Sequence, residues 1–266
     1  MENLLKERVD NVSNLYQKHN YLNKDIKYLS NTNIREYDMK AGGFSILKRA
    51  GCLSEKEINF LSSCSKLERN IYLGNKVKNN PELNEIQMNG FIEARQLFLE
   101  ANNISDESIL SIKKDALFII KDVAKVTEID GFTFNMANMY NSYYYINEME
   151  FYYSTKTNSV DIKGLGKANI PLHQDYFIKD LCRIFSLAEK NNNDYLIKYL
   201  AKYRLDYINK DLPLEHYREL NNESGFRLLN KLGGEDIIAD YIDDIDMIDH
   251  RYNYIKYIIP LISYYL

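Results

Sequence analysis

The 266-residue chain contains no tryptophan, three cysteines, four prolines and eleven glycines. So little glycine and proline excludes collagen-like and proline-rich chains. Cys52, Cys64 and Cys182 are too few and too scattered for a disulfide framework, and no Cys or His pair has the spacing of a structural zinc site. The 34 basic and 38 acidic residues give a net charge of −4, so any basic surface that could bind nucleic acid must be local.

Long apolar runs are also missing. The longest, Tyr257–Leu266, falls well short of the ~20 residues that a membrane-spanning helix needs. The first twenty residues are polar and charged, which is not the pattern of a signal peptide. We therefore expect a reduced, cytoplasmic protein with no membrane partner. The 45% of hydrophobic residues are enough for a sizeable core, in one large domain or two small ones.

The spacing of apolar residues indicates helices and strands in succession along the chain. Leucine, valine and tyrosine at intervals of three and four predict a helix over residues 1–30. Ser54, with Glu57 three residues later, forms a capping box for a helix that starts at Glu55. The other expected elements are a strand at Ile34–Met39, a helix at Glu85–Ala101, two strands within Ile109–Ile120 that meet at a charged turn, and strands within Phe132–Tyr153 and Val160–Ile162.

From Phe177 to the end, helical spacing dominates. The expected fold class is therefore α+β, with an antiparallel sheet that carries helices on one face, followed by an all-helical region.

Two aspartates, Asp38 and Asp115, fall where expected strands end or turn. Two carboxylates held side by side on rigid backbone are what a pair of Mg²⁺ ions requires for phosphoryl transfer. The alternative is that both are ordinary carboxylates in surface turns. Asp122 and Asp161 are weaker candidates for the same role, since neither lies in a matching motif.

Four segments, in order, resemble motifs of the family B DNA polymerases. In the first, Asp38 is followed seven residues later by Ser45-Ile46-Leu47; the second runs from Lys66 through Asn70 and Tyr72 to Gly74. The third is Asp115-Ala116-Leu117-Phe118-Ile119, and the fourth is Lys163-Gly164 with Lys167. The resemblance covers about residues 34–230 and implies a palm and a thumb.

The resemblance implies a role for each matched residue. Asp38 and Asp115 would be the catalytic metal ligands for two Mg²⁺ ions, with Mn²⁺ as a substitute. The nucleotide would be bound by Gly43, Lys66, Asn70 and Tyr72, with Arg69 in reserve, and primer or template by Lys163, Gly164 and Lys167. The implied domains are an N-terminal helical segment at 1–33, a palm at 34–170 with very short fingers at about 48–104, and a helical thumb-like region at 171–266.

The chain departs from the family in three respects. Lys113 stands where the third motif normally has its first aspartate, and Gly43 replaces the tyrosine five residues after the first aspartate. In addition, the 33 residues before the palm leave no room there for a proofreading exonuclease. A glycine at position 43 predicts an open sugar pocket that accepts ribonucleotides.

The leading functional prediction is a template- or primer-extending nucleotidyltransferase of polymerase type. Its partners would be nucleoside triphosphates, a DNA or RNA primer-template and other replication subunits. A second interpretation is a non-catalytic palm-like subunit, or a nucleic-acid-binding or assembly protein of a replication complex, which the loss of the first aspartate favours. A third is a helical interaction protein whose motif matches are accidental. In that case Asp38 and Asp115 would not be neighbours.

Overall fold

The computed structural model describes residues 19–146, 149–164, 174–190, 192–209, 211, 218–221 and 225–228. The chain divides into two compact units. Unit 1 contains residues 1–23 and 33–139, and unit 2 contains residues 24–32 and 140–266. The architecture is mixed α+β with antiparallel strand pairs, as the sequence predicted.

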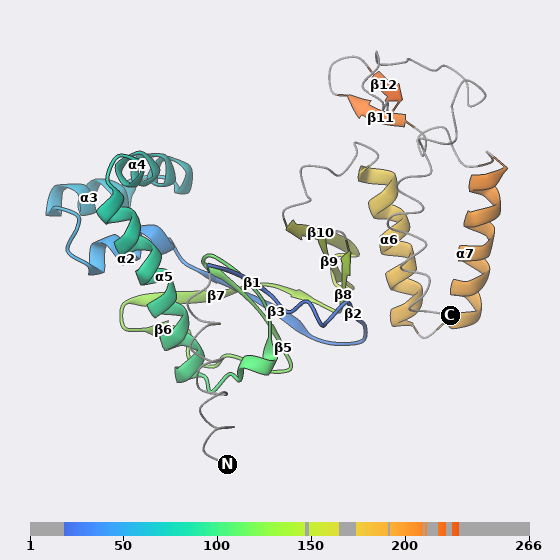
Figure 1. Cartoon of the computed structure of the whole chain (residues 1–266), viewed down its shortest axis with the longest axis horizontal. Helices are drawn as coiled ribbons and strands as arrows, with labels where there is room; N and C mark the ends of the chain where they lie inside the picture. The colour runs from blue at the N-terminus through green and yellow to red at the C-terminus, as the bar shows by residue number, and fades with distance from the viewer. Residues whose placement is uncertain are drawn as a thin grey trace. The chain divides into compact units, whose positions relative to one another are not determined.

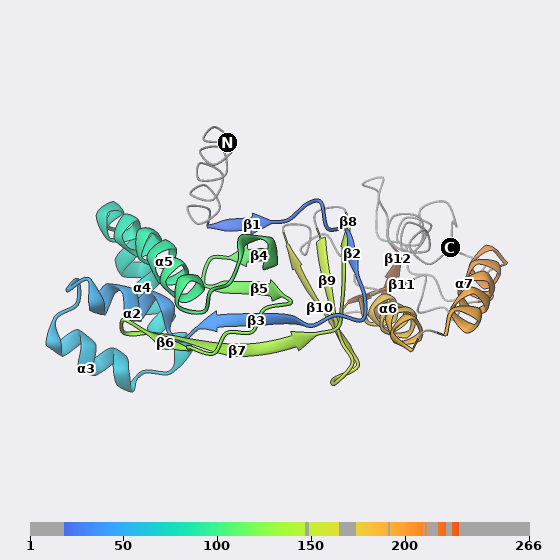
Figure 2. The ribbon, with the colours of Figure 1, turned by 90° about the horizontal axis from the view of Figure 1, so that it is seen from below.

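Unit 1 is built on a six-stranded sheet with the order β1-β4-β5-β3-β7-β6, whose strands lie side by side in Figure 2. Its strands are β1 (Asn20–Leu22), β3 (Ile34–Met39), β4 (Ile109–Lys113), β5 (Ala116–Ile120), β6 (Glu128–Ile129) and β7 (Phe132–Tyr140). The strand at Ile34–Met39 and the β4–β5 hairpin with its charged turn confirm the sequence predictions. The central position of β3, between β5 and β7, places the end of that strand in the middle of the unit.

Four helices of unit 1 group together in Figure 1: α2 (Gly42–Arg49), α3 (Glu55–Ser63), α4 (Lys66–Lys78) and α5 (Pro81–Ala101). Ser54 and Ser65 each form a complete capping box, with Glu57 and Glu68 respectively, which confirms the predicted start of α3. Helix α5 begins four residues earlier than predicted, because Asn80 caps it and Pro81 occupies its first turn.

Helix α5 covers one face of the sheet. The ring of Phe98 packs at a tilt against Tyr37 of β3 and Phe134 of β7, with centroid distances of 5.3 and 4.4 Å. These rings belong to a buried cluster that also contains Met39, Phe91, Ala94, Leu99, Ile112, Leu117, Ile119 and Phe132. The buried cluster fixes α5, and hence the side chains of its first half, relative to the end of β3.

Small residues allow α2 and α5 to approach closely. A Cβ atom added at Gly90 would lie 2.2 Å from Cγ2 of Ile46, and one added at Gly42 would lie 2.7 Å from the Phe91 ring. Larger side chains at either position would push the two helices apart. The glycines therefore bring the start of α2 against the face of α5.

Unit 2 contains a four-stranded sheet with the order β10-β9-β8-β2. The strands are β2 (Tyr28–Leu29), β8 (Ser142–Ile146), β9 (Met149–Ser154) and β10 (Ser159–Gly164). Helices α6 (Gln174–Glu189) and α7 (Asn193–Ile208) follow, and α6 packs on the sheet, where Phe185 stacks against Tyr153 with centroids 5.6 Å apart. A two-stranded sheet, β11 (Arg218–Asn221) and β12 (Gly225–Leu228), completes the described part of this unit.

Two sequence predictions of secondary structure are wrong. The predicted helix over 1–30 cannot include residues 20–29, because β1 there pairs with the outer edge of β4 and β2 pairs with β8. The region after Phe177 is not all helical, because Arg218–Asn221 and Gly225–Leu228 pair as antiparallel strands. In both places the strands are too short for a period of two to stand out in the sequence.

Across the described ranges, no helix combines the length and the apolar character that crossing a membrane would require.

Candidate functional site

The sheet of unit 1 brings Asp38 and the Asp115 turn together. Asp38 is the last residue of β3 that pairs with β5, and its partner is Ala116, the residue after Asp115. The backbone N–H of Met39 donates to the carbonyl oxygen of Asp115 at 3.1 Å. Asp38, at the end of β3, and Asp115, in the turn before the neighbouring strand β5, therefore lie at the same end of the sheet.

The charges of the two aspartates interact. Burial raises the pKa of Asp38 above its usual value, and the nearby carboxylate of Asp115 raises it further. The ammonium group of Lys66 acts in the opposite direction, while Glu36 adds to the increase in pKa. A site that disfavours its own negative charge in this way is stabilised when a cation neutralises it.

Glu36 is an acidic residue of this strand that the sequence analysis overlooked. Its side chain is buried, and its Oε2 accepts a hydrogen bond of 2.7 Å from the side-chain amide of Asn138 on β7. Because side chains alternate along a strand, Glu36 shares a face of β3 with Asp38. The interval of two residues between them was the signal that could have identified it.

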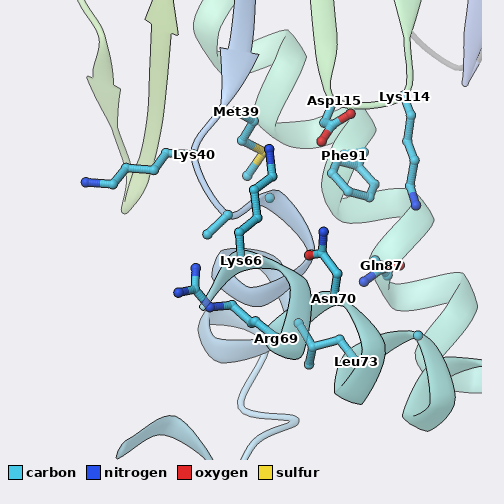
Figure 3. Close-up of a pocket in the computed structure, with 14 residues that line it drawn as sticks. Met39, Lys40, Lys66, Arg69, Asn70, Leu73, Gln87, Phe91, Lys114 and Asp115 are labelled. Atoms are coloured by element: carbon cyan, nitrogen blue, oxygen red, sulfur yellow. The ribbon is translucent and has the colours of Figure 1, made fainter. Parts of the chain in front are cut away.

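A pocket of about 380 Å³ opens beside these strand ends, within the range of ~300–1,000 Å³ typical of small-molecule sites. Figure 3 shows Lys66 and Asn70 rising from α4 toward the strand ends that carry Met39 and Asp115. The pocket contains four of the predicted site residues: Gly43, Lys66, Asn70 and Asp115. Its complete lining is Met39, Lys40, Ala41, Gly42, Gly43, Lys66, Arg69, Asn70, Leu73, Gly74, Gln87, Phe91, Lys114 and Asp115.

Basic groups dominate the lining of the pocket. Lys40, Lys66, Arg69 and Lys114 line it together with one acidic residue, Asp115. Arg69 is held in place because its guanidinium donates to the carbonyl oxygens of Leu61 and Cys64, at 3.0 and 2.9 Å. A pocket with this excess of positive charge favours an anionic ligand.

The start of α2 also favours an anion. Its N-cap residue, Ala41, has a left-handed backbone conformation with φ of 50° and provides no side-chain cap, and the first turn contains no acidic residue. The backbone N–H groups of a helix start carry partial positive charge, and here they adjoin the pocket. Together with the basic side chains, they suit the oxygens of phosphate groups.

Arg95 supports the turn that carries Asp115. Its side chain is only 1% exposed, and its guanidinium donates a hydrogen bond to the carbonyl oxygen of Lys114. Burial lowers the pKa of Arg95 to about 10, while the negative charge of Asp115 opposes this decrease. Lys114 itself has a φ of 54°, a left-handed conformation that the two-residue turn between β4 and β5 requires.

The position of Gly43 has a different explanation from the one the sequence indicated. The space beside Gly43 is not vacant, because a Cβ atom added there would lie 2.6 Å from Nε2 of Gln87. Gln87 and Phe91, one turn apart on α5, both line the pocket and were missed by the sequence analysis. Their spacing of four residues along the helix was the available signal.

The other predicted site residues within the described ranges, Asp38 among them, are not part of the lining of this pocket. Tyr72 does not line it; its hydroxyl donates to Oε1 of Glu57 at 2.9 Å, which ties α4 to α3. Lys163 and Gly164 belong to β10 of unit 2, where Lys163 pairs directly with the buried Glu150. Lys167 lies outside the described residues. Asp161, also in unit 2, accepts a hydrogen bond of 2.6 Å from the hydroxyl of Tyr140.

The donor set of the site is suited to a metal ion only in part. Among the described residues, no group of three or more His, Cys, Asp or Glu side chains is arranged to hold an ion. Mg²⁺ nevertheless binds commonly through one or two carboxylates together with substrate phosphates and water. Asp38 and Asp115 fit that mode, in which the phosphates of the ligand complete the coordination.

The fold and site together define a mixed α+β protein with a basic pocket at the end of its sheet where a central strand carries Asp38 and the neighbouring turn carries Asp115. A family model described as bacteriophage PBS1 gene 130 protein matches residues 11–264, and the chain therefore belongs to this family. That description names a phage gene product and states no activity. No match was found among curated proteins.

Proposed function

We propose that this phage-family protein is a nucleotidyltransferase of polymerase type, which adds nucleotides to the 3′-hydroxyl of a primer and uses Mg²⁺. The observation that carries the proposal is that Asp38, at the end of β3, lies beside the turn that carries Asp115, and that Asp115 lines a pocket together with four basic residues. The order of the motifs that resemble those of family B DNA polymerases supports the same function.

In the proposed reaction, the primer 3′-hydroxyl loses its proton to water and its oxygen attacks the α-phosphorus of a nucleoside triphosphate. The phosphodiester bond forms, the bond from the α-phosphorus to the α,β-bridging oxygen breaks, and pyrophosphate leaves. Mg²⁺ ions, when bound, would lower the pKa of the hydroxyl and neutralise the phosphate charge. Asp38 and Asp115 would hold the metal, and Arg95 would keep the Asp115 turn in place. Lys66 and the start of α2 would bind the phosphates and orient the α-phosphorus toward the carboxylates.

One observation favours the alternative of a nucleotide-binding subunit without catalysis. The two aspartates are not joined by a third metal-ligating side chain among the described residues, and Lys113 occupies the position where the family has a further aspartate. Such a subunit would bind a nucleotide in the same pocket and would incorporate none.

The test of the pocket is nucleotide binding, measured by calorimetry with MgCl₂ and a non-hydrolysable nucleoside triphosphate. Lys66→Ala should weaken binding about tenfold or more, since a hydrogen bond to a charged group contributes about 1.5–3 kcal/mol. The matched control is Lys78→Ala, at the other end of α4 and outside the pocket, which should leave the affinity unchanged. Equal affinities for wild type and Lys66→Ala would refute the assignment of the pocket.

A further inference from the structure

Gln87 has no hydrogen-bond partner within the described part of the chain, although its side chain is almost fully buried. The residue is 8% exposed, lines the pocket, and lies against the backbone of Gly43. The amide atoms are not closed off inside the protein; they are open to the pocket, where water or a ligand can reach them. A ligand in the pocket would provide the missing partner.

The chemistry of the amide indicates which part of a ligand it meets. A carboxamide both donates and accepts hydrogen bonds, as a hydroxyl group does, whereas ionised phosphate oxygens only accept. The basic side chains and the start of α2 already provide donors for phosphates. Gln87 is therefore matched to a neutral, hydroxyl-bearing part of the ligand.

Phe91 supports this division of the pocket. Its ring lies one turn from Gln87 on α5, and the ammonium group of Lys114 lies 5.0 Å from its centroid. The ring is only 2% exposed and belongs to the buried cluster, so it closes the wall of the pocket beside the amide and leaves Gln87 as the polar group on that side. In Figure 3, Gln87 and Phe91 project from α5 on the side of the pocket opposite Lys40 and Arg69.

We propose that Gln87 hydrogen-bonds the 2′-hydroxyl of the bound nucleotide and that the pocket therefore selects ribonucleoside triphosphates. The inference rests on the proposed function and names its substrate class. The 2′-hydroxyl is the group that a ribonucleotide has and a deoxyribonucleotide lacks, so comparing the two classes of nucleotide tests this contact directly. A bound deoxyribonucleotide would shield the amide from water without giving it a partner, and sites built to bind a hydroxyl reject analogues that lack it.

The experiment compares the affinities of the full-length protein for ATP and 2′-deoxy-ATP, both as non-hydrolysable analogues with MgCl₂. Wild type should bind the ribonucleotide at least about tenfold more tightly. Gln87→Leu, which keeps the approximate size and removes all hydrogen bonding, should reduce this ratio to within about twofold. Gln87→Glu keeps the shape of the side chain and loses its N–H donors. If the leucine variant does not fold, the ratio of the two affinities is measured with this variant instead.

Gln96→Leu is the matched control, because Gln96 lies on the same helix, is exposed, and donates to Glu100 at 2.8 Å. This variant should keep the wild-type ratio. A deoxyribonucleotide preference in wild type, or a ratio that Gln87→Leu and Gln87→Glu leave unchanged, would overturn the assignment of Gln87 while the proposed function stands. Failure of wild type to bind either nucleotide would refute the proposed function as well.

Discussion

Substitution of Gly90 by alanine should destabilise the protein, because this glycine lets α5 pack against α2. The added Cβ atom would lie 2.2 Å from Cγ2, 3.0 Å from Cγ1 and 3.2 Å from Cβ of Ile46. Rotating the Ile46 side chain cannot relieve a contact that includes its own Cβ atom, and Ile46 is only 3% exposed. The helices must therefore separate.

Overpacking of this kind costs about 1–3 kcal/mol, and the better helix propensity of alanine returns about 1 kcal/mol. At the upper end, the net loss is about 2 kcal/mol, which corresponds to a decrease in Tm of roughly 4–8 °C. Thermal unfolding followed by circular dichroism measures this decrease. Gly74→Ala is the matched control, since nothing lies within 4 Å of its added Cβ, and it should raise Tm by about 2–4 °C.

A double-mutant cycle separates the close contact from other effects of the substitution. Ile46→Ala removes both Cγ atoms, so Gly90→Ala should cost clearly less in that background than in wild type. If Gly90→Ala is as stable as Gly74→Ala, or if its cost is the same in both backgrounds, the close approach of α2 and α5 is not what positions the start of α2 beside Gln87.

Two further predictions concern pH and charge. Burial and the charge of Asp115 raise the pKa of Asp38, so the ionised form of this side chain destabilises the folded protein. Asp38→Asn should therefore raise Tm slightly in metal-free buffer at neutral pH. This gain should vanish as the pH falls below the usual pKa of an aspartate, because the side chain is then neutral in the folded and the unfolded protein. The hydrogen bond from Lys76, with those from Ser54 and Tyr72, lowers the pKa of Glu57 to about 2. The stability that Glu57 provides should therefore be lost as the pH falls from about 4.5 to about 2, and Glu57→Gln should remove this part of the pH dependence in acid titrations followed by circular dichroism.

The strand and helix patterns that position the carboxylates could be predicted from the sequence because each contains a strong local signal. Ser54 and Glu57 specify the start of α3 through their own hydrogen bonds. The β4–β5 hairpin could be predicted because apolar runs flank a charged turn at Lys114 and Asp115. Short strands such as β1 could not be predicted, since tertiary pairing with β4 determines them.

The contacts between elements carried no local signal. Gln87 reaches Gly43 only because Gly90 allows α5 to approach α2, and no pattern within either helix reveals that approach. Arg95 looks like an ordinary helical arginine in the sequence, yet it is fully buried under the Asp115 turn. Tyr72 shows the converse case, because a motif position that resembled a nucleotide ligand serves to join two helices.

Nucleotide incorporation by the purified full-length protein is the most direct test of the proposed site. The assay supplies a labelled primer-template, MgCl₂ or MnCl₂, and both classes of nucleoside triphosphate. Wild type should extend the primer, and Asp115→Asn and Asp38→Asn should each abolish extension while remaining folded. Asp122→Asn, which changes a carboxylate after the other end of β5, should retain it. Extension that persists in both Asp38→Asn and Asp115→Asn, or no extension by wild type under any of these conditions, would contradict a catalytic role for the two aspartates.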